Sequence, residues 1–436
     1  MRVRQRPSIL ILLASAAGLA GAQSESTPAA PAAEPRDLLS IAKTEADRER
    51  AALTSRVSQL LNELRSSSDG SLAFIQKKIE ELRAIGAPAI EMLAEAMNHT
   101  SDASPEINAG INASRALAGI HGQQAAGALT RLTREGGKFG RLNAVRALGL
   151  RGDPTFLPVL EKLLTDEDPE LVRLAIEAIG GLGGPGSEAL LIRFIDSKEA
   201  AYTSTAIAGL AQLAAKAAAP QILARLRKEL AAAEPAANVI EAGVSYLKVC
   251  PLAEALPELQ QALEGSAAPL SRRLAAVEAL LATGQSVSGT RKAVLKILRT
   301  ASLGALRAVT KAAALAMAEL GDDSGISAVT ADLDREIDQN PRNYNALYKR
   351  AELYLEFSKW QRAASDFRDG LRQEKDPRDP DRVYLGLAHA YAGMSRYADA
   401  AKYLNRLPEA RVKTLPEEYT VFREMADDSR YGRIFR

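Results

Sequence analysis

The stretch Arg146-Ala147-Leu148-Gly149 decides the fold, because closely similar stretches recur along the chain at a nearly constant interval. They are Arg83-Ala84-Ile85-Gly86, Arg115-Ala116-Leu117-Ala118 and Glu177-Ala178-Ile179-Gly180, at steps of 32, 31 and 31 residues. An alanine recurs with the same 31-residue step, at Ala113, Ala144, Ala175 and Ala206. A fixed period of this size indicates a repeat architecture, in which each repeat is one small unit that stacks on the next.

Each repeat is predicted to contain two helices. In the unit from Asn143 to Thr165, Gly152 lies in the turn and Asp153-Pro154 opens the second helix; Asp168-Pro169 then opens the first helix of the next unit. Aspartate suits the N-cap and proline the first helical turn. The second helix carries an apolar stripe at helical spacing, formed by Phe156, Leu157, Val159, Leu160, Leu163 and Leu164. One helix pair cannot bury both of its faces, so neighbouring pairs must stack.

From Arg141 to Ile195 the sequence resembles the HEAT-like repeats found in many bacterial proteins. The resemblance lies in Gly152-Asp153-Pro154 inside one repeat and Asp168-Pro169-Glu170 between repeats. It implies an armadillo-type α-solenoid, which we assign to residues 71–340 as about eight helix pairs. The pairs after Pro220 are less regular in sequence.

Composition and spacing change after this array. Most of the aromatic residues of the protein lie from Tyr344 onward. Two sets of spaced positions, offset by 37 residues, resemble tetratricopeptide repeats: Leu347, Ala351, Tyr354, Ala363, Phe367 and Leu371, then Tyr384, Leu387, Ala388, Tyr391, Ala400 and Leu404. We assign two such units to residues 341–410, and a capping helix with a short tail to residues 411–436. The predicted fold class is therefore all-α, a right-handed α-solenoid of stacked antiparallel helix pairs with a HEAT-like array followed by tetratricopeptide repeats.

The N-terminal part has the layout of an exported protein. Residues 1–22 combine an arginine-rich start, a short apolar stretch and the small-residue site Ala20-Gly21-Ala22, as in a secretory signal peptide. The apolar stretch is shorter than the roughly 20 residues that span a bilayer. Residues 23–36 are rich in proline, alanine and serine and are predicted to be a disordered linker. An amphipathic helix is expected within residues 37–70, where it caps the array or pairs with a partner helix.

Net charge and cysteine content narrow the range of possible functions and partners. The protein of 436 residues has a formal net charge of +2, and removal of the arginine-rich leader leaves it close to neutral. A near-neutral exported protein is not expected to bind nucleic acid. Cys250 is the only cysteine, so no intrachain disulfide forms, and we interpret it as a buried structural thiol rather than one that pairs between two copies.

Motifs for catalysis and cofactor binding are absent or lack the required context. The loop from Gly181 to Gly186 satisfies the glycine pattern of a dinucleotide site, but a helix precedes it where that site needs a strand. The alternating acidic residues from Asp332 to Asp338 have isoleucine at position 337, where a calcium loop requires glycine. We therefore assign no catalytic, cofactor-binding or metal-binding residue, and expect no cofactor.

One basic segment is a candidate for partner binding. Between Glu278 and Glu319 the sequence has no acidic residue, and the same interval holds Arg291, Lys292, Lys296, Arg299, Arg307 and Lys311. Aligned cations on adjacent repeats attract anionic partners. The alternative is an ordinary solvated face whose acidic neighbours come from adjacent repeats.

The tetratricopeptide-like segment offers a second candidate. Versions of this repeat that grip the C-terminus of another protein carry lysine and asparagine at positions that match Tyr348 and Glu352 in the first unit and Leu385 and His389 in the second. That carboxylate clamp is therefore absent. Tyr348, Glu352 and His389 remain candidates for a groove, against the alternative that they pack in the core or at its rim.

These observations predict a non-catalytic scaffold or adaptor in the bacterial periplasm or outside the cell. Its partner is expected to be a protein or peptide, with an acidic partner as one alternative, and no membrane span remains after leader cleavage. Two other functions stay open. One is an enzyme, since some HEAT-like repeat proteins resemble bilin lyases; the other is a structural envelope component without a discrete partner. The oligomeric state is not specified by the sequence.

Overall fold

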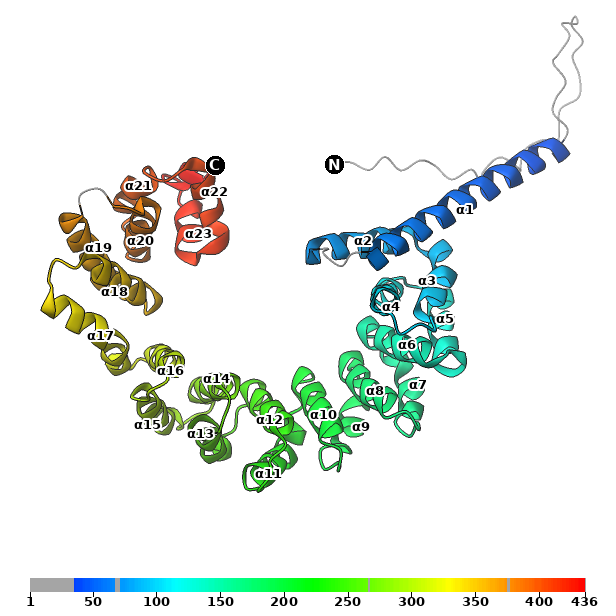
Figure 1. Cartoon of the computed structure of the whole chain (residues 1–436), viewed down its shortest axis with the longest axis horizontal. Helices are drawn as coiled ribbons and strands as arrows, with labels where there is room; N and C mark the ends of the chain where they lie inside the picture. The colour runs from blue at the N-terminus through cyan, green and yellow to red at the C-terminus, as the bar shows by residue number, and fades with distance from the viewer. Residues whose placement is uncertain (1–34, 67–70, 266, 375–376, 436) are drawn as a thin grey trace, which may run out of the picture.

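The protein is a curved stack of helices, as the computed structural model shows (Figure 1). The structure describes residues 35–66, 71–265, 267–374 and 377–435, and all regular elements in these ranges are helical. The leader assigned to residues 1–22 lies outside the described residues. So does the linker assigned to residues 23–36, apart from its last two residues, which begin the first helix. The predicted all-helical solenoid is confirmed.

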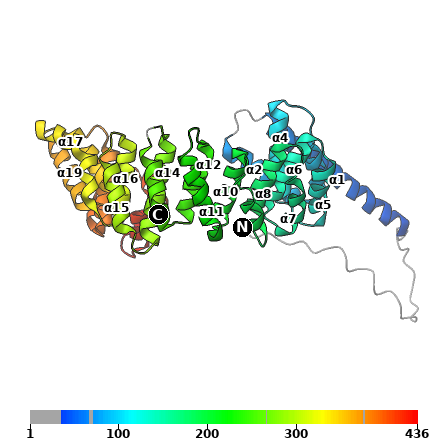
Figure 2. The ribbon, with the colours of Figure 1, turned by 90° about the horizontal axis from the view of Figure 1, so that it is seen from below.

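Two rows of helices build the central arc. Helices of the inner row pack directly on one another along the concave side (Figure 1); they are α4 (Ser104–Ala118), α6 (Lys138–Arg151), α8 (Pro169–Leu182), α10 (Ala200–Gln212), α12 (Ala237–Val249), α14 (Leu270–Ser286) and α16 (Arg307–Glu319). The outer row lies on the convex side and consists of α3 (Ile90–Met97), α5 (Gln123–Glu135), α7 (Leu157–Leu163), α9 (Ser187–Ile192), α11 (Ala219–Leu230), α13 (Leu256–Glu264) and α15 (Arg291–Ser302). Seen at 90°, the stacked helices form a band (Figure 2).

The turns inside and between repeats follow the sequence signals. Gly152 ends α6 in the left-handed conformation at φ 64°, which glycine adopts without a steric penalty. The Asp153 carboxylate then accepts a hydrogen bond from the Thr155 amide at 3.0 Å, and Asp168 does the same for Glu170 at 2.9 Å at the start of α8. Both predicted N-caps are confirmed. A short 3₁₀ turn precedes α7, which therefore begins at Leu157 rather than at the proline.

The recurring stretch lies where inner helices cross. Its final glycine has no room for a side chain: a Cβ on Gly149 would lie 2.8 Å from the Cα of Ala178, and one on Gly180 would lie 2.7 Å from the Cα of Gly209. The alanines of the 31-residue frame are buried, and Ala147 is fully buried as well. Small residues at these fixed positions let neighbouring helices approach backbone to backbone, and this close approach sets the inner side of the arc.

A long helix closes the N-terminal end. Helix α1 (Pro35–Ser66) packs its last three turns, through Val57, Leu60 and Leu64, on α2 (Leu72–Ile85), α3 and α4. Its earlier part extends away from the stack (Figures 1 and 2). Within the described residues, no helix is long and apolar enough to cross a membrane.

The C-terminal part continues the stack as helical hairpins. It comprises α17 (Ile326–Gln339), α18 (Tyr344–Glu356), α19 (Trp360–Gln373), α20 (Pro380–Gly393) and α21 (Tyr397–Leu404). Two short helices, α22 (Glu409–Glu418) and α23 (Thr420–Asp427), follow where the sequence predicted one capping helix. Pro416 lies in the last turn of α22, and the backbone is extended at Tyr419 before α23 begins.

The array and the hairpins are joined rather than tethered. A small apolar cluster of Ala314, Ile326 and Phe357 lies between the two larger cores. The Arg350 guanidinium bridges α17 and α19, since it donates to Asp334 at 2.8 Å and to both oxygens of Asp366 at 2.7 and 2.9 Å. These two carboxylates raise the pKa of Arg350 above its ordinary value. Helix α17 is thus the transition between the array and the hairpins.

Candidate functional site

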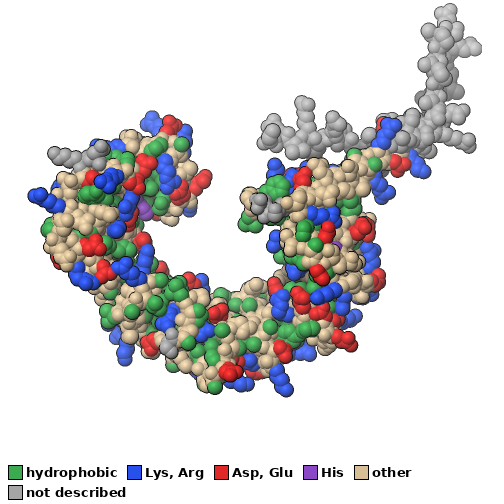
Figure 3. Space-filling model, in the orientation of Figure 1, with side chains coloured by type: hydrophobic (Ala, Val, Ile, Leu, Met, Phe, Trp, Pro, Cys, Tyr) green, Lys and Arg blue, Asp and Glu red, His purple; other side chains and the backbone are tan. Residues whose placement is uncertain are grey.

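The concave side of the arc is open to solvent and carries apolar, basic and acidic side chains (Figure 3). Two hollows of about 170 and about 380 Å³ lie side by side on it and share Glu177 and Gln212. Together they form one groove across α6, α8, α10 and α12, which we call the concave groove. Its other lining residues are Arg146, Gly149, Leu150, Leu174, Ala178 and Gly181 in the first hollow, and Ser204, Thr205, Ala208, Gly209, Asn238 and Glu241 in the second.

Two arginines of the recurring stretch have no carboxylate partner: Arg146, which lines the concave groove, and Arg115, which is exposed on the neighbouring inner helix α4. Arg115 and Arg146 lie at equivalent positions of α4 and α6, and each donates from Nη1 to the asparagine one turn earlier: Asn112 at 3.3 Å and Asn143 at 2.7 Å. Both asparagines are buried, at 5% and 3% exposure. Among the described residues, neither guanidinium has an ion pair. We call these four residues the Asn–Arg ladder.

A hydrogen bond to the outer helix α3 holds Asn143 of the ladder in place. The Asn143 amide nitrogen donates to the Met97 carbonyl at 3.0 Å, which leaves its oxygen oriented toward Arg146. Burial lowers the pKa of the Arg146 guanidinium below its ordinary value. Arg83, the third arginine of the recurring stretch, has a structural role instead, since it pairs with Glu80 at 2.7 Å and donates to the Arg115 carbonyl at 2.9 Å.

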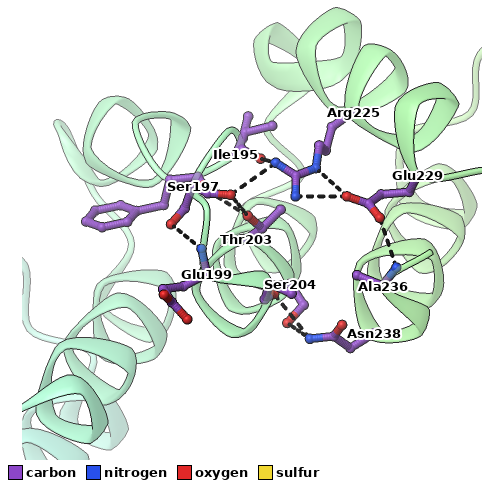
Figure 4. Close-up of polar contacts among 11 residues, drawn as sticks. Ile195, Ser197, Glu199, Thr203, Ser204, Arg225, Glu229, Ala236 and Asn238 are labelled. Atoms are coloured by element: carbon purple, nitrogen blue, oxygen red, sulfur yellow. Dashed lines mark hydrogen bonds and ion pairs between the residues drawn. The ribbon is translucent and has the colours of Figure 1, made fainter. Parts of the chain in front are cut away.

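The middle of the groove has an uncharged floor. Helix α10 contains no charged residue and exposes Ala208 beside Thr205 and Ser204. The Asn238 amide from α12 donates to the Ala200 carbonyl at 3.1 Å and to the Ser204 hydroxyl at 3.0 Å, which joins α12 to α10 (Figure 4). Short side chains on this floor leave space for another backbone to approach.

A buried ion pair fixes the loops that precede α10 and α12 (Figure 4). Arg225 and Glu229, on α11, are 7% and 8% exposed, and the Arg225 Nη2 lies 2.9 Å from the Glu229 Oε1. Arg225 also donates to the carbonyls of Ile195 at 3.3 Å and Ser197 at 3.2 Å, while Glu229 accepts from the Ala236 amide at 2.9 Å. The pair therefore ties both loops to the outer row, which gives it a structural role.

The predicted basic segment is not one continuous positive surface. Arg291, Lys292, Lys296 and Arg299 lie on the outer helix α15, whereas Arg307 and Lys311 lie on the inner helix α16. Later repeats supply counter-charges: Arg299 pairs with Asp322 at 2.6 Å, Lys311 with Glu356 at 2.5 Å, and Arg307 with Asp332. Hydrogen bonds from Ser324, with Arg299, lower the pKa of Asp322 to about 2.

The other basic residues divide between structure and surface. Arg291 donates from Nε to the Leu320 carbonyl at 2.8 Å, whereas Lys292 and Lys296 are exposed. The carboxylates that neutralise Arg299, Arg307 and Lys311 come from the repeats that follow, as the alternative of an ordinary solvated face predicts for these three residues.

The three residues proposed for a tetratricopeptide groove do not form one. Tyr348 is 3% exposed and stacks on Phe367 with ring centroids 6.0 Å apart, and burial raises the pKa of its phenol. Glu352 accepts two hydrogen bonds from Arg382. Their roles are therefore core packing and an interhelical ion pair.

His389 is enclosed by aromatic rings. Its ring centroid lies 5.0 Å from Tyr419, 5.4 Å from Trp360 and 5.8 Å from Phe422. Burial lowers its pKa to about 4, so it is neutral at pH 7. The alternative in which these residues pack at the core or its rim is the one observed.

The glycine-rich loop and the acidic run singled out in the sequence are structural elements of the solenoid. Gly181 and Leu182 end α8 and residues 183–186 form the turn before α9, while the acidic run from Asp332 lies inside α17. Within the described part of the protein, no group of three histidine, cysteine or acidic residues is placed to hold a metal ion. A cleft of about 830 Å³ between α1, α3 and α4 is lined by mixed polar residues and by His99, which stacks on Phe139 at 4.4 Å.

Comparison with known proteins adds the following. A family model for HEAT repeats matches residues 90–180, 140–212 and 157–242. No curated protein sequence matches this one. Among solved structures, the protein is similar to Kap121p bound to Pho4p, with 12% identity and a TM-score of 0.53 over 88% of this chain and 49% of that one. This likeness concerns the fold alone.

Two shorter structures also match. Human deoxyhypusine hydroxylase has 18% identity and a TM-score of 0.26 over 62% of this chain and 97% of its own. The complex of CpcE and CpcF of phycocyanin lyase from Nostoc sp. PCC7120 has 21% identity and a TM-score of 0.33 over 56% of this chain and 94% of that one. Residues 90–242 thus match HEAT repeats, and they are set within a longer α-solenoid.

Proposed function

We propose that this protein is a non-catalytic scaffold or adaptor that holds a protein partner on its concave face. One observation carries the proposal: the inner row presents a groove across four helices, open to solvent and floored by short side chains. Such a surface accepts an extended segment or a loop of another protein rather than enclosing a small substrate. The solenoid Kap121p was solved with Pho4p bound, so this fold is compatible with protein binding.

The groups that line the groove favour binding over catalysis. They are arginine, amide, hydroxyl and carboxylate groups, and the concave groove includes neither Cys250 nor any of the three histidines. A general base near neutral pH is most often a histidine, and a covalent enzyme needs an activated nucleophile. In this proposal the protein therefore acts by binding its partner and not by catalysing a reaction.

In this proposal the protein is located in the bacterial envelope. It rests on the leader-like layout of residues 1–22, with its basic start, short apolar stretch and small-residue site. N-terminal sequencing of the mature protein after cell fractionation tests it. A mature protein that begins at Gln23 in the periplasm or medium supports export, and a cytoplasmic protein that retains Met1 contradicts it.

The binding proposal is tested with a matched pair of alanine substitutions. Ala208 is exposed on the inner helix α10 and Ala224 is exposed on the outer helix α11. Residues 23–436, carrying Ala208→Arg or Ala224→Arg, are used as baits in native envelope extract beside the unaltered protein, with quantitative mass spectrometry of what they retain. Partners that are lost with Ala208→Arg and kept with Ala224→Arg support a concave binding face.

Two results count against the adaptor proposal. If all three baits retain the same partners, binding occurs elsewhere than on the concave groove. If none retains a discrete partner while the protein fractionates with insoluble envelope, the structural alternative is favoured.

A further inference from the structure

We propose that the Asn–Arg ladder recognises two carboxylates on an extended, acidic segment of a protein partner. The inference rests on the proposed protein-binding function and names the chemistry of the segment that the concave face selects. It assigns this role to Arg115 and Arg146, and a positioning role to Asn112 and Asn143.

The first step is that the two guanidiniums are oriented but not neutralised. Each uses one N–H on a buried asparagine, at 3.3 Å for Arg115 and 2.7 Å for Arg146. A guanidinium has five N–H donors in a planar fork, so most of its donors remain for a ligand. Most other arginines of the inner row and its loops are engaged differently; Arg141, for example, pairs with Asp166 and donates to the Thr133 carbonyl at 3.2 Å.

The second step concerns the kind of ligand. Arg146 is partly buried, and a partly desolvated cation is stabilised when an anion with matching geometry covers it, whereas Arg115 is exposed. The guanidinium fork matches a carboxylate in a bidentate arrangement, and holding the fork in place reduces the entropy lost on binding. The asparagines provide that hold, since Asn143 is itself fixed by the Met97 carbonyl at 3.0 Å.

The third step concerns the size of the ligand. Arg115 and Arg146 occupy the same frame position on α4 and α6, which are packed neighbours. Packed helices lie roughly 8–10 Å apart, and Arg115 acts electrostatically on Arg146, so a ligand with two carboxylates can give each arginine a bidentate partner of its own. An extended peptide rises about 3.3 Å per residue, so two acidic residues two to four positions apart fit the separation.

The fourth step separates a peptide from a uniform polyanion. Glu177 lines the same hollow as Arg146, and both Glu170 and Glu177 act electrostatically on that arginine. Glu177 pairs with Arg173 at 3.1 Å and forms no ion pair with Arg146 among the described residues. These carboxylates repel a ligand with a charge at every unit. Leu150, which is 58% exposed, lines the hollow as well and suits an apolar residue beside the acidic one.

The test is a selection with defined variants. A displayed library of random 12-residue peptides is panned on immobilised residues 23–436, and the affinities of the enriched peptides are measured by fluorescence anisotropy. The same peptides are then measured against Arg146→Gln, Arg115→Gln and the outer-row control Arg131→Gln. Arg131 lies on α5 and forms an exposed ion pair with Glu91 at 2.8 Å, so its loss removes one positive charge away from the groove. Circular dichroism confirms that each variant is folded.

The proposal expects enriched peptides with two acidic residues two to four positions apart. Arg146→Gln should weaken their binding about tenfold, as should Arg115→Gln, because each removes a charge-assisted contact. Arg131→Gln should leave affinity unchanged, and Arg146→Lys should give an intermediate loss because it keeps the charge without the fork. Raising the salt concentration should weaken binding.

Several outcomes overturn the proposal. They are the absence of enriched peptides, enriched peptides without acidic residues, equal affinity for Arg146→Gln and the unaltered protein, and inorganic polyphosphate that binds with the same dependence on both arginines as well as the peptides do. If neutral or basic peptides are enriched and Ala208→Arg abolishes their binding, the concave protein-binding face stands and only the ladder fails.

Discussion

The inner row of the array and the C-terminal hairpins both depend on glycine at helix crossings, but they fill the space around it in opposite ways. In the array, Gly180 faces the backbone of Gly209, with a virtual Cβ 2.7 Å from its Cα. In the hairpins, Gly370, Gly386 and Gly393 each face an aromatic ring, of Tyr348, Phe367 and Trp360 respectively. One region brings two backbones together, and the other inserts a ring into a notch.

The difference explains the change in composition along the sequence. Close backbone contact needs small residues on both helices, so the inner row is rich in alanine and glycine and its repeats keep a 31-residue period up to α10. Ring-in-notch packing needs one small and one large partner, so the aromatic residues collect from Tyr344 onward. Two regions of one stack therefore tolerate different substitutions.

The largest effect is expected from a charge placed in the backbone-to-backbone crossing. Ala147 is fully buried in α6, and Ala147→Asp should lower the free energy of unfolding by about 4 kcal/mol or more, because an unpaired charge would be buried where no space allows hydration. Thermal and chemical denaturation measure it. Ala208→Asp, on the exposed face of α10, is the control and should change stability little. Equal effects of the two would mean that the crossing is misassigned.

Acid should affect the hairpins before the array. The pKa of His389 is lowered to about 4 by burial, against about 6.5 in an unfolded protein. A histidine with a depressed folded pKa contributes stability above pH 6.5, and this stability is lost as the pH falls from 6.5 toward 4. The expected loss is about 2–3 kcal/mol, reached near pH 4.

The only tryptophan of the protein reports on this region, since the Trp360 and His389 ring centroids are 5.4 Å apart. Its fluorescence should show unfolding of the hairpins at a higher pH than far-ultraviolet circular dichroism shows for the whole stack. His389→Phe should shift the fluorescence transition to lower pH. Coincident transitions by both probes in the unaltered protein would contradict the prediction.

The smallest effect separates the two kinds of crossing directly. Gly180→Ala and Gly386→Ala should each cost about 1–2 kcal/mol, since overpacking outweighs the gain of roughly 1 kcal/mol in helix propensity. Only the second should be relieved by Phe367→Leu, because there a side chain causes the clash. A double-mutant cycle measures the coupling. The changes in unfolding free energy of Gly180→Ala and Phe367→Leu should be additive. If those of Gly386→Ala and Phe367→Leu were additive as well, the two kinds of helix crossing would not differ.

The sequence predicted the periodic parts of the fold well, for a physical reason. The N-caps Asp153 and Asp168 and the recurring alanines act locally or repeat with a fixed period, so they are readable without coordinates. The division of the C-terminal cap into α22 and α23 was missed. It depends on how Phe422 and Met425 pack on the last hairpin, which is a tertiary effect.

The sequence predicted the charge and contacts of the surface less well than the fold, because these depend on side chains that come from other repeats. The basic segment has no acidic neighbour in the sequence, but Asp322, Asp332 and Glu356 reach it from the following helices. The Asn–Arg ladder had a signal that was not used: an asparagine three residues before the arginine, at Asn112 and Asn143 in consecutive repeats. Only the structure shows that both asparagines are buried and that no carboxylate of the described residues pairs with the arginines.

The backbone contact at the inner crossings also limits how the arc can change its curvature. Closing it further would press Gly149 onto Ala178 and Gly180 onto Gly209, and packed protein interiors have low compressibility. Opening it would separate these helices and expose alanines that are fully buried, at a cost that grows gradually with the exposed apolar area. We therefore expect the arc to resist tightening more steeply than widening, so that it adapts to a larger partner more readily than to a smaller one.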